Sequence, residues 1–115
     1  MNTRDNKDKG DQWEALVAEY YQNKWYTLLQ KKYTIHWGEL DLILENDELL
    51  TFVEVKVMDY MDDFFDYITL KKLGTIKKTI ERYLLKHPTD KPYVLDIVFV
   101  KHNSIVEIYE NVTNT

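Results

Sequence analysis

The chain has 115 residues, of which 44% are hydrophobic and 14% aromatic, so it can form one domain with a real core and is too apolar to be disordered. Its formal net charge of −5 argues against a general nucleic-acid-binding protein, which is usually basic, so any contact with nucleic acid must use a local patch. No apolar run approaches the ~20 residues of a transmembrane helix, so we expect no membrane contact, and the absence of cysteine excludes disulfides and suits a cytoplasmic protein.

A polar segment opens the chain, and we expect residues 1–10 to be a disordered tail before a single domain over residues 11–115. The pattern of a first helix begins at Asp11, which is suited to be its N-cap, with Glu14 three residues on as in a capping box. The apolar residues of this helix recur at the spacing of one buried face: Trp13, Leu16, Val17, Tyr20 and Tyr21. The aromatic and β-branched segment 25–33 then predicts a first strand.

Two residues follow that strand with two readings each. His36 is either a metal ligand or, as we favour, a polar surface residue. Trp37 either stacks on a base or, as we favour, anchors a partly buried loop.

The segment from Gly38 to Lys56 contains two runs with a period of two, which is the pattern of β-strands. Asn46 and Asp47 lie between the runs and indicate a tight turn, so the segment predicts a β-hairpin. The first run separates leucines from mostly acidic residues, with Leu40, Leu42 and Leu44 on one face and Glu39, Asp41, Ile43 and Glu45 on the other.

The hairpin register decides which side chains meet. A two-residue loop places Asp41 opposite Phe52 and Glu39 opposite Glu54, whereas a four-residue loop at 46–49 places Asp41 opposite Glu54. Both loops put Asp41, Glu54 and Lys56 on one face, while a three-residue loop would separate them.

These charges are either a solvated polar side or a reactive site. Ile43 and Phe52 share their face, which places the charges at one end of an otherwise buried surface. Carboxylate oxygens suit Mg²⁺ or Mn²⁺, and a lysine two residues after Glu54 can hold a water or neutralise charge on a phosphate.

An acidic and aromatic segment at 58–66 has no clear period and is expected to be a loop or a short helical turn. A second helix is predicted over residues 69–86, with a buried stripe of Leu73, Ile76, Ile80, Tyr83 and Leu84. Its other side collects positive charge and is either a solvated face or the place where DNA phosphates would lie, together with two earlier lysines: Lys71, Lys72, Lys78 and Arg82, with Lys31 and Lys32.

The nearly all-apolar segment 93–100 predicts a strand covered on both faces, and 104–109 predicts an edge strand. Asp96 is the only charge in the first of these, and we favour a structural hydrogen-bonding role over a supporting role at the charged site. The order of elements predicts an α/β fold with a mixed sheet, in which the strand after the second helix lies parallel to a neighbour.

Asp41, followed by Glu54-Val55-Lys56 on the next strand, resembles the PD-(D/E)xK signature of restriction-endonuclease-like nucleases. The strings GELDLI, FVEVK, QWEALVAEYY and LDIVFV resemble more closely the YraN-type family of small uncharacterised proteins, relatives of archaeal Holliday-junction resolvases, over roughly residues 10–111. The resemblance implies a restriction-endonuclease-like αβββαβ core, with a mixed central sheet flanked by helices. It also matches a family glutamate with Glu14 and a family lysine with Lys72, whereas Met58 stands where the family has an arginine.

We therefore expect a metal-dependent endonuclease that hydrolyses phosphodiester bonds in DNA. Asp41, Glu54 and the Val55 carbonyl would bind Mg²⁺ or Mn²⁺, and Lys56 would position or activate the attacking water. Two further acids would complete the site: Glu14 and Glu39. Only the kinship with resolvases suggests branched or structured DNA, and cutting two strands would require a homodimer.

The alternative is a nuclease-like fold that binds nucleic acid or protein without turnover. The acidic balance and Met58 favour this alternative, while Asp41, Glu54 and Lys56 oppose it.

Overall fold

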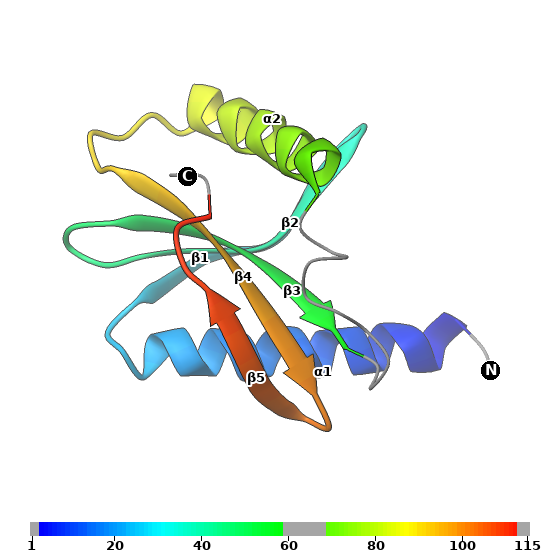
Figure 1. The fold of residues 1–115 in the computed structure, drawn as a ribbon. Helices are drawn as coiled ribbons and strands as arrows, with labels where there is room; N and C mark the ends of the chain where they lie inside the picture. The colour runs from blue at the N-terminus through cyan, green and yellow to red at the C-terminus, as the bar shows by residue number, and fades with distance from the viewer. Residues whose placement is uncertain (1–2, 59–68, 113–115) are drawn as a thin grey trace.

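A computed structural model describes residues 3–58 and 69–112, with side chains from Gly10 onward. Helix α1 (Thr3–Gln22) and helix α2 (Leu70–Lys86) lie on opposite faces of a five-stranded sheet (Figure 1). The strands are β1 (Thr27–Ile35), β2 (Gly38–Glu45), β3 (Leu50–Val57), β4 (Tyr93–Lys101) and β5 (Ser104–Tyr109). This arrangement confirms the predicted α/β class and is compatible with an αβββαβ core. The segment expected at 58–66 as a loop or helical turn lies, beyond Met58, outside the described residues.

The strands follow one another across the sheet in chain order, from β1 at one edge to β5 at the other. Strands β3 and β4 are parallel, in register from Leu50 opposite Tyr93 to Val57 opposite Val100, and the other neighbouring pairs are antiparallel. The mixed sheet, its parallel pair and the edge position of residues 104–109 are therefore as predicted. Within the described part of the chain, no helix is both long and apolar enough to span a membrane.

Each face of the sheet carries its own hydrophobic cluster, because apolar side chains project from both faces of the central strands. On the α1 face the helix packs against the centre of the sheet, through Val17, Ala18, Tyr21, Leu42, Leu44, Val53, Val98 and Val100. On the α2 face the cluster contains Leu40, Ile43, Leu50, Phe52, Ile80, Tyr83 and Leu95. Burying one large apolar side chain fully stabilises a fold by about 1.5–3 kcal/mol, so these clusters hold the three layers together.

Helix α1 begins at Thr3, so most of the expected tail is helical, and Asp11 lies inside the helix and cannot be its N-cap. The prediction of the start was wrong because apolar periodicity reports where a helix face is buried, not where helical backbone begins. The Asp11 carboxylate instead binds Lys32 Nζ at 2.5 Å. Strand β1 likewise begins at Thr27, because Trp25 has a left-handed φ of 71° that belongs to the turn after the helix.

Helix α2 approaches the start of β2 very closely at Gly38. A Cβ atom at this position would lie 2.2 Å from Thr79 Oγ1, so only glycine permits this approach. Thr69 caps the helix, because its hydroxyl accepts a hydrogen bond from the Lys72 amide at 3.2 Å. The close contact and the cap together fix the first turns of α2 over the end of the β2–β3 hairpin.

Candidate functional site

The β2–β3 hairpin closes through a four-residue connection, which selects one of the two registers that the sequence left open. Glu45 pairs with Leu50 and Ile43 pairs with Phe52. The Asn46 side chain organises the turn, because its Oδ1 accepts the amides of Glu48 and Leu49 at 2.9 and 2.8 Å. This register places Asp41 opposite Glu54.

Side-chain hydrogen bonds take over where the ladder between β2 and β3 ends, after the pair Leu42–Val53. The Val55 amide donates to Asp41 Oδ2 at 2.7 Å, and the Asp41 amide donates to Glu54 Oε1 at 3.3 Å. Lys56 Nζ lies 3.7 Å from Glu54 Oε2. The two acids and the lysine are thus close together, as the register argument predicted, and the acids also hold the diverging strands.

The side chains of β2 do not alternate strictly between the two faces of the sheet near Asp41, contrary to the prediction from the sequence. Leu40 packs with Ile43 in the α2-side cluster, whereas Leu42 and Leu44 pack on the α1 side. Strict alternation would have put all three leucines on one face. The change occurs next to Asp41, where β2 leaves β3 and a side chain replaces the backbone ladder.

Burial makes both acids of the hairpin hard to ionise. Glu54 is only 7% exposed, and burial together with the charge of Asp41 raises its pKa to about 8, although Lys56 lowers it in part. Burial likewise raises the pKa of Asp41, as does the charge of Glu39, against the Val55 amide and Lys56. Two carboxylates that repel each other in a buried place favour a proton or a cation between them.

Helix α1 places Glu14 near enough to Asp41 for the two charges to interact, although Glu14 lines a separate hollow on the α1 side. Burial and the charge of Asp41 raise the pKa of Glu14 to about 7, and Lys32, whose Nζ is 3.9 Å from Glu14 Oε2, opposes this. The other oxygen, Oε1, is buried and has no hydrogen-bond partner among residues 10–58 and 69–112. Because the helix starts well before Asp11, Glu14 does not belong to an N-terminal capping box.

A cavity of about 450 Å³ opens between the hairpin and the first turns of α2. Glu39, Glu54 and Lys56 line it from the sheet, and Thr69, Lys71, Lys72, Thr75 and Ile76 line it from the helix side. Two of the predicted basic residues therefore face this cavity.

The remaining basic residues lie elsewhere. Lys78 and Arg82 are exposed further along α2 and do not line the cavity. Lys31 and Lys32 line a separate hollow of about 300 Å³ with Asp11 and Glu14, on the α1 side. Since Lys32 is paired with Asp11, it neutralises the protein's own acid.

The described residues contain no cluster of three or more side chains that could ligate a metal ion. Within residues 3–58 and 69–112, no three His, Cys, Asp or Glu side chains are grouped so as to hold a metal ion. His36 is exposed, and Trp37 is 45% exposed, at the β1–β2 turn. A metal at the hairpin would therefore rely on Asp41 and Glu54, with a backbone carbonyl and waters; the role of the Val55 carbonyl stays a prediction.

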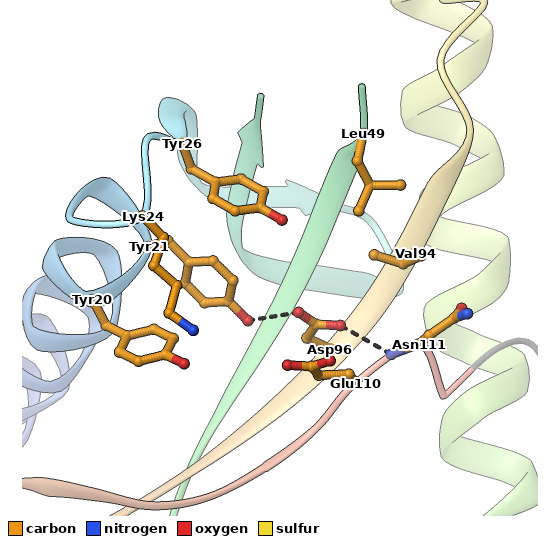
Figure 2. A pocket seen from close by; sticks show the side chains of 9 residues that line it. All are labelled: Tyr20, Tyr21, Lys24, Tyr26, Leu49, Val94, Asp96, Glu110 and Asn111. Carbon is orange, nitrogen blue, oxygen red and sulfur yellow. Dashed lines mark hydrogen bonds between the residues drawn. The ribbon is translucent and has the colours of Figure 1, made fainter. Parts of the chain in front are cut away.

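Sequence reasoning did not find a second cavity, which lies beside the C-terminal end of α1 (Figure 2). At its base, Asp96 Oδ2 accepts the Tyr21 hydroxyl at 2.7 Å, and Oδ1 accepts the Asn111 amide at 3.0 Å. The favoured reading of Asp96 as a structural hydrogen-bonding residue is thus confirmed. A single charge in an apolar strand signals a buried partner, but its partners lie too far away in sequence to be identified.

Comparison with known proteins gives one consistent family. The uncharacterised protein family UPF0102 matches residues 13–100, and this match confirms the resemblance to the YraN-type family. A UPF0102 protein of Nitratiruptor is 35% identical over 104 residues, which are 90% of this chain and 91% of that protein. A UPF0102 protein of Campylobacter fetus is 33% identical over 104 residues, covering 90% and 92%, respectively.

Proposed function

The chain belongs to the uncharacterised protein family UPF0102, and we propose that it is a metal-dependent nuclease that hydrolyses phosphodiester bonds in DNA. The observation that supports this most is the meeting of Asp41, Glu54 and Lys56 at the point where β2 and β3 diverge. Two acids and an ammonium group are the groups that phosphodiester hydrolysis with a hard divalent ion requires, and Glu54 and Lys56 of this set line an open cavity.

The residues present fit a Mg²⁺ or Mn²⁺ ion. Both acids have carboxylate oxygens, and their raised pKa values reflect a place where negative charge lacks compensation. The buried Glu14 Oε1, which no described residue hydrogen-bonds, points to the same deficit from the side of α1. Asp41 and Glu54 would hold the ion, with Glu14 and Glu39 as the outer acids and the Val55 carbonyl as a further oxygen. A divalent ion there supplies positive charge at a scissile phosphate and makes a water molecule easier to deprotonate.

Basic side chains of the protein would bind the attacking water and the phosphates. Lys56 Nζ, held near Glu54, would donate a hydrogen bond to the attacking water or to the phosphate oxygens. Lys71 and Lys72, across the cavity on α2, would bind phosphates of the DNA backbone, and the exposed Lys78 and Arg82 would extend this contact along the helix. A homodimer and a branched substrate are parts of this proposal that only the kinship with resolvases suggests.

A cleavage assay tests the proposal directly. Labelled linear, flapped and four-way DNAs are incubated with the protein and Mn²⁺, and the products are resolved on denaturing gels. We expect cleavage by the wild type, loss of cleavage with Lys56→Ala, and normal cleavage with Lys77→Ala, a matched exposed lysine on α2 outside the cavity. Absence of metal-dependent cleavage of every DNA form would refute the enzymatic proposal.

One observation favours a nuclease fold without turnover as the second candidate. Met58, at the position of the family's arginine, is 8% exposed and packs with Ile97 and Phe99, so it offers no phosphate contact. Thermal melting separates the two proposals. A metal-binding site should raise the melting temperature as Mn²⁺ increases, and Asp41→Asn should abolish that rise. A wild type that shows neither a metal-dependent shift nor cleavage would support the silent module.

A further inference from the structure

The second cavity has a volume of about 290 Å³ and lies between the C-terminal end of α1 and the first residues of β4. It opens on the α1 face of the sheet, where Asp96 projects, whereas the cavity next to Glu54 opens towards α2. Binding pockets for drug-sized ligands usually occupy ~300–1,000 Å³, so this cavity suits a molecule at or below the small end of that range.

Its two walls carry opposite chemistry. The wall from α1 and the following turn presents hydroxyl and ammonium groups from Tyr20, Lys24 and Tyr26 (Figure 2). The opposite wall presents the carboxylates of Asp96 and Glu110 (Figure 2). A ligand between the walls therefore meets hydrogen-bond donors on one side and acceptors on the other.

The two carboxylates differ in how many hydrogen bonds they already accept. Each oxygen of Asp96 already accepts a hydrogen bond, from the Tyr21 hydroxyl and from the Asn111 amide. Glu110 is exposed at the mouth, and no hydrogen bond to its carboxylate is formed by any side chain or amide of the described residues. Among the described lining residues, two acceptors therefore remain without a donor: the Glu110 carboxylate at the mouth and the buried Asn111 Oδ1.

Lys24 is held in place on the donor wall. Its Nζ lies over the Tyr20 ring, 4.5 Å from the ring centroid, and contact with Tyr20 and the charge of Glu110 raise the pKa of Lys24. Tyr21 packs edge-to-face with both Tyr20 and Tyr26, with ring centroids 5.3 Å apart in each pair, so the aromatic wall is rigid.

We propose that this cavity binds a guanine base, with the Glu110 carboxylate accepting its N1–H and N2–H₂ groups and Lys24 donating to its O6. Among the common bases, guanine alone offers two adjacent donors that match the two oxygens of a carboxylate, with a keto acceptor beside them. The tyrosine side chains supply apolar and aromatic surface for the ring faces. This binding does not depend on the proposed nuclease function.

The same base chemistry has two sources, a free guanine nucleotide and an unpaired guanine in a nucleic-acid strand. The position of Trp25 favours an unpaired guanine in a nucleic-acid strand. This residue lies between the lining residues Lys24 and Tyr26 in the sequence and is 90% exposed, with a φ of 71°. Exposed aromatic side chains next to a base pocket offer stacking surface to a neighbouring base.

Calorimetric titration of the wild-type protein with GMP, AMP, CMP and UMP tests the proposal. EDTA is present, so that the outcome is independent of any metal-dependent activity. We expect GMP to bind about 5- to 150-fold more tightly than AMP, which is the discrimination that a bidentate base contact typically contributes. Glu110→Gln should reduce this ratio to near one, and Glu107→Gln, a matched exposed glutamate on β5, should leave it unchanged.

Titration with a dT₅dG and a dT₅dA hexamer distinguishes the sources. Tighter binding of dT₅dG than of GMP identifies a strand as the ligand, and equal binding identifies the free nucleotide. Both results require that dG be preferred over dA. Equal binding of all nucleotides, no binding at millimolar concentration, or a guanine preference unaffected by Glu110→Gln would overturn the proposal. Circular dichroism melting of Glu110→Gln verifies that the variant is folded.

Discussion

Replacing Glu54 by glutamine should stabilise the metal-free protein at alkaline pH, although it removes a buried acid of the candidate site. Burial and the nearby charge of Asp41 raise the pKa of Glu54 from 4.5 to about 8. The folded state therefore retains the proton while the unfolded chain loses it, so the wild type loses stability as the pH rises from 4.5 to 8. Glutamine keeps the acceptor for the Asp41 amide but has no proton to lose.

The size of the effect follows from the distance between the two pKa values. A tenfold change in a protonation equilibrium corresponds to about 1.4 kcal/mol, so a pKa that moves from 4.5 to about 8 gives a difference on the order of a few kcal/mol. The positive charge of Lys56 already offsets part of the cost of ionising Glu54. In a domain of this size, 1 kcal/mol changes the melting temperature by about 4 °C or more. We thus expect Glu54→Gln to melt roughly 10 °C above the wild type at pH 8.5.

Differential scanning calorimetry from pH 5 to pH 8.5 in EDTA measures this difference. The advantage of Glu54→Gln should shrink towards pH 5, where the folded wild type is also neutral at this position. Glu48→Gln, an exposed glutamate in the turn of the same hairpin, serves as the matched control and should follow the wild type. Parallel melting curves of the wild type and Glu54→Gln over this range would contradict the account of the site's electrostatics.

Three other experiments test the close contact at Gly38, the buried hydrogen bond of Asp96 and the pKa of Glu14. Gly38→Ala should lower the free energy of unfolding in urea by about 1–3 kcal/mol, because its Cβ meets Thr79 Oγ1, and adding Thr79→Ala should recover part of the loss; strictly additive losses would contradict this. Tyr21→Phe should cost about 1–3 kcal/mol in urea, since Asp96 loses a buried donor, and an unchanged stability would show that the hydrogen bond contributes nothing. Carboxyl-detected NMR should give Glu14 a pKa near 7, and an ordinary value near 4.5 would place this side chain in solvent.

The β2–β3 hairpin and helix α2 were predictable because patterns of neighbouring residues in the sequence determine them. Alternation identified both strands, Asn46 and Asp47 located the turn, and Asp41 and Glu54 came together for either register that kept them on one face. The choice between the registers needed the structure, because it depends on the Asn46 side chain binding two amides of the turn. Helix α2 was predicted almost to the residue from its amphipathic pattern, and the structure adds Thr69 as its N-cap.

What could not be predicted depends on contacts between distant segments. The position of Leu40 on the α2 side follows from the divergence of β2 from β3, which no local pattern encodes. The start of α1 preceded its apolar pattern, because the pattern reports contact with the sheet. The second cavity joins Tyr21 to Asp96, two residues 75 positions apart, so no sequence window contains it.

The exchange of hydrogen bonds between Asp41 and the strand bearing Glu54 and Val55 has a consequence for how such proteins evolve. The two acids fasten neighbouring strands where backbone pairing has stopped, but only their hydrogen bonds matter for the architecture. A relative with no use for the buried charge could therefore exchange Glu54 for glutamine, which still accepts from the Asp41 amide, whereas Lys56 makes neither of these hydrogen bonds and could vary first.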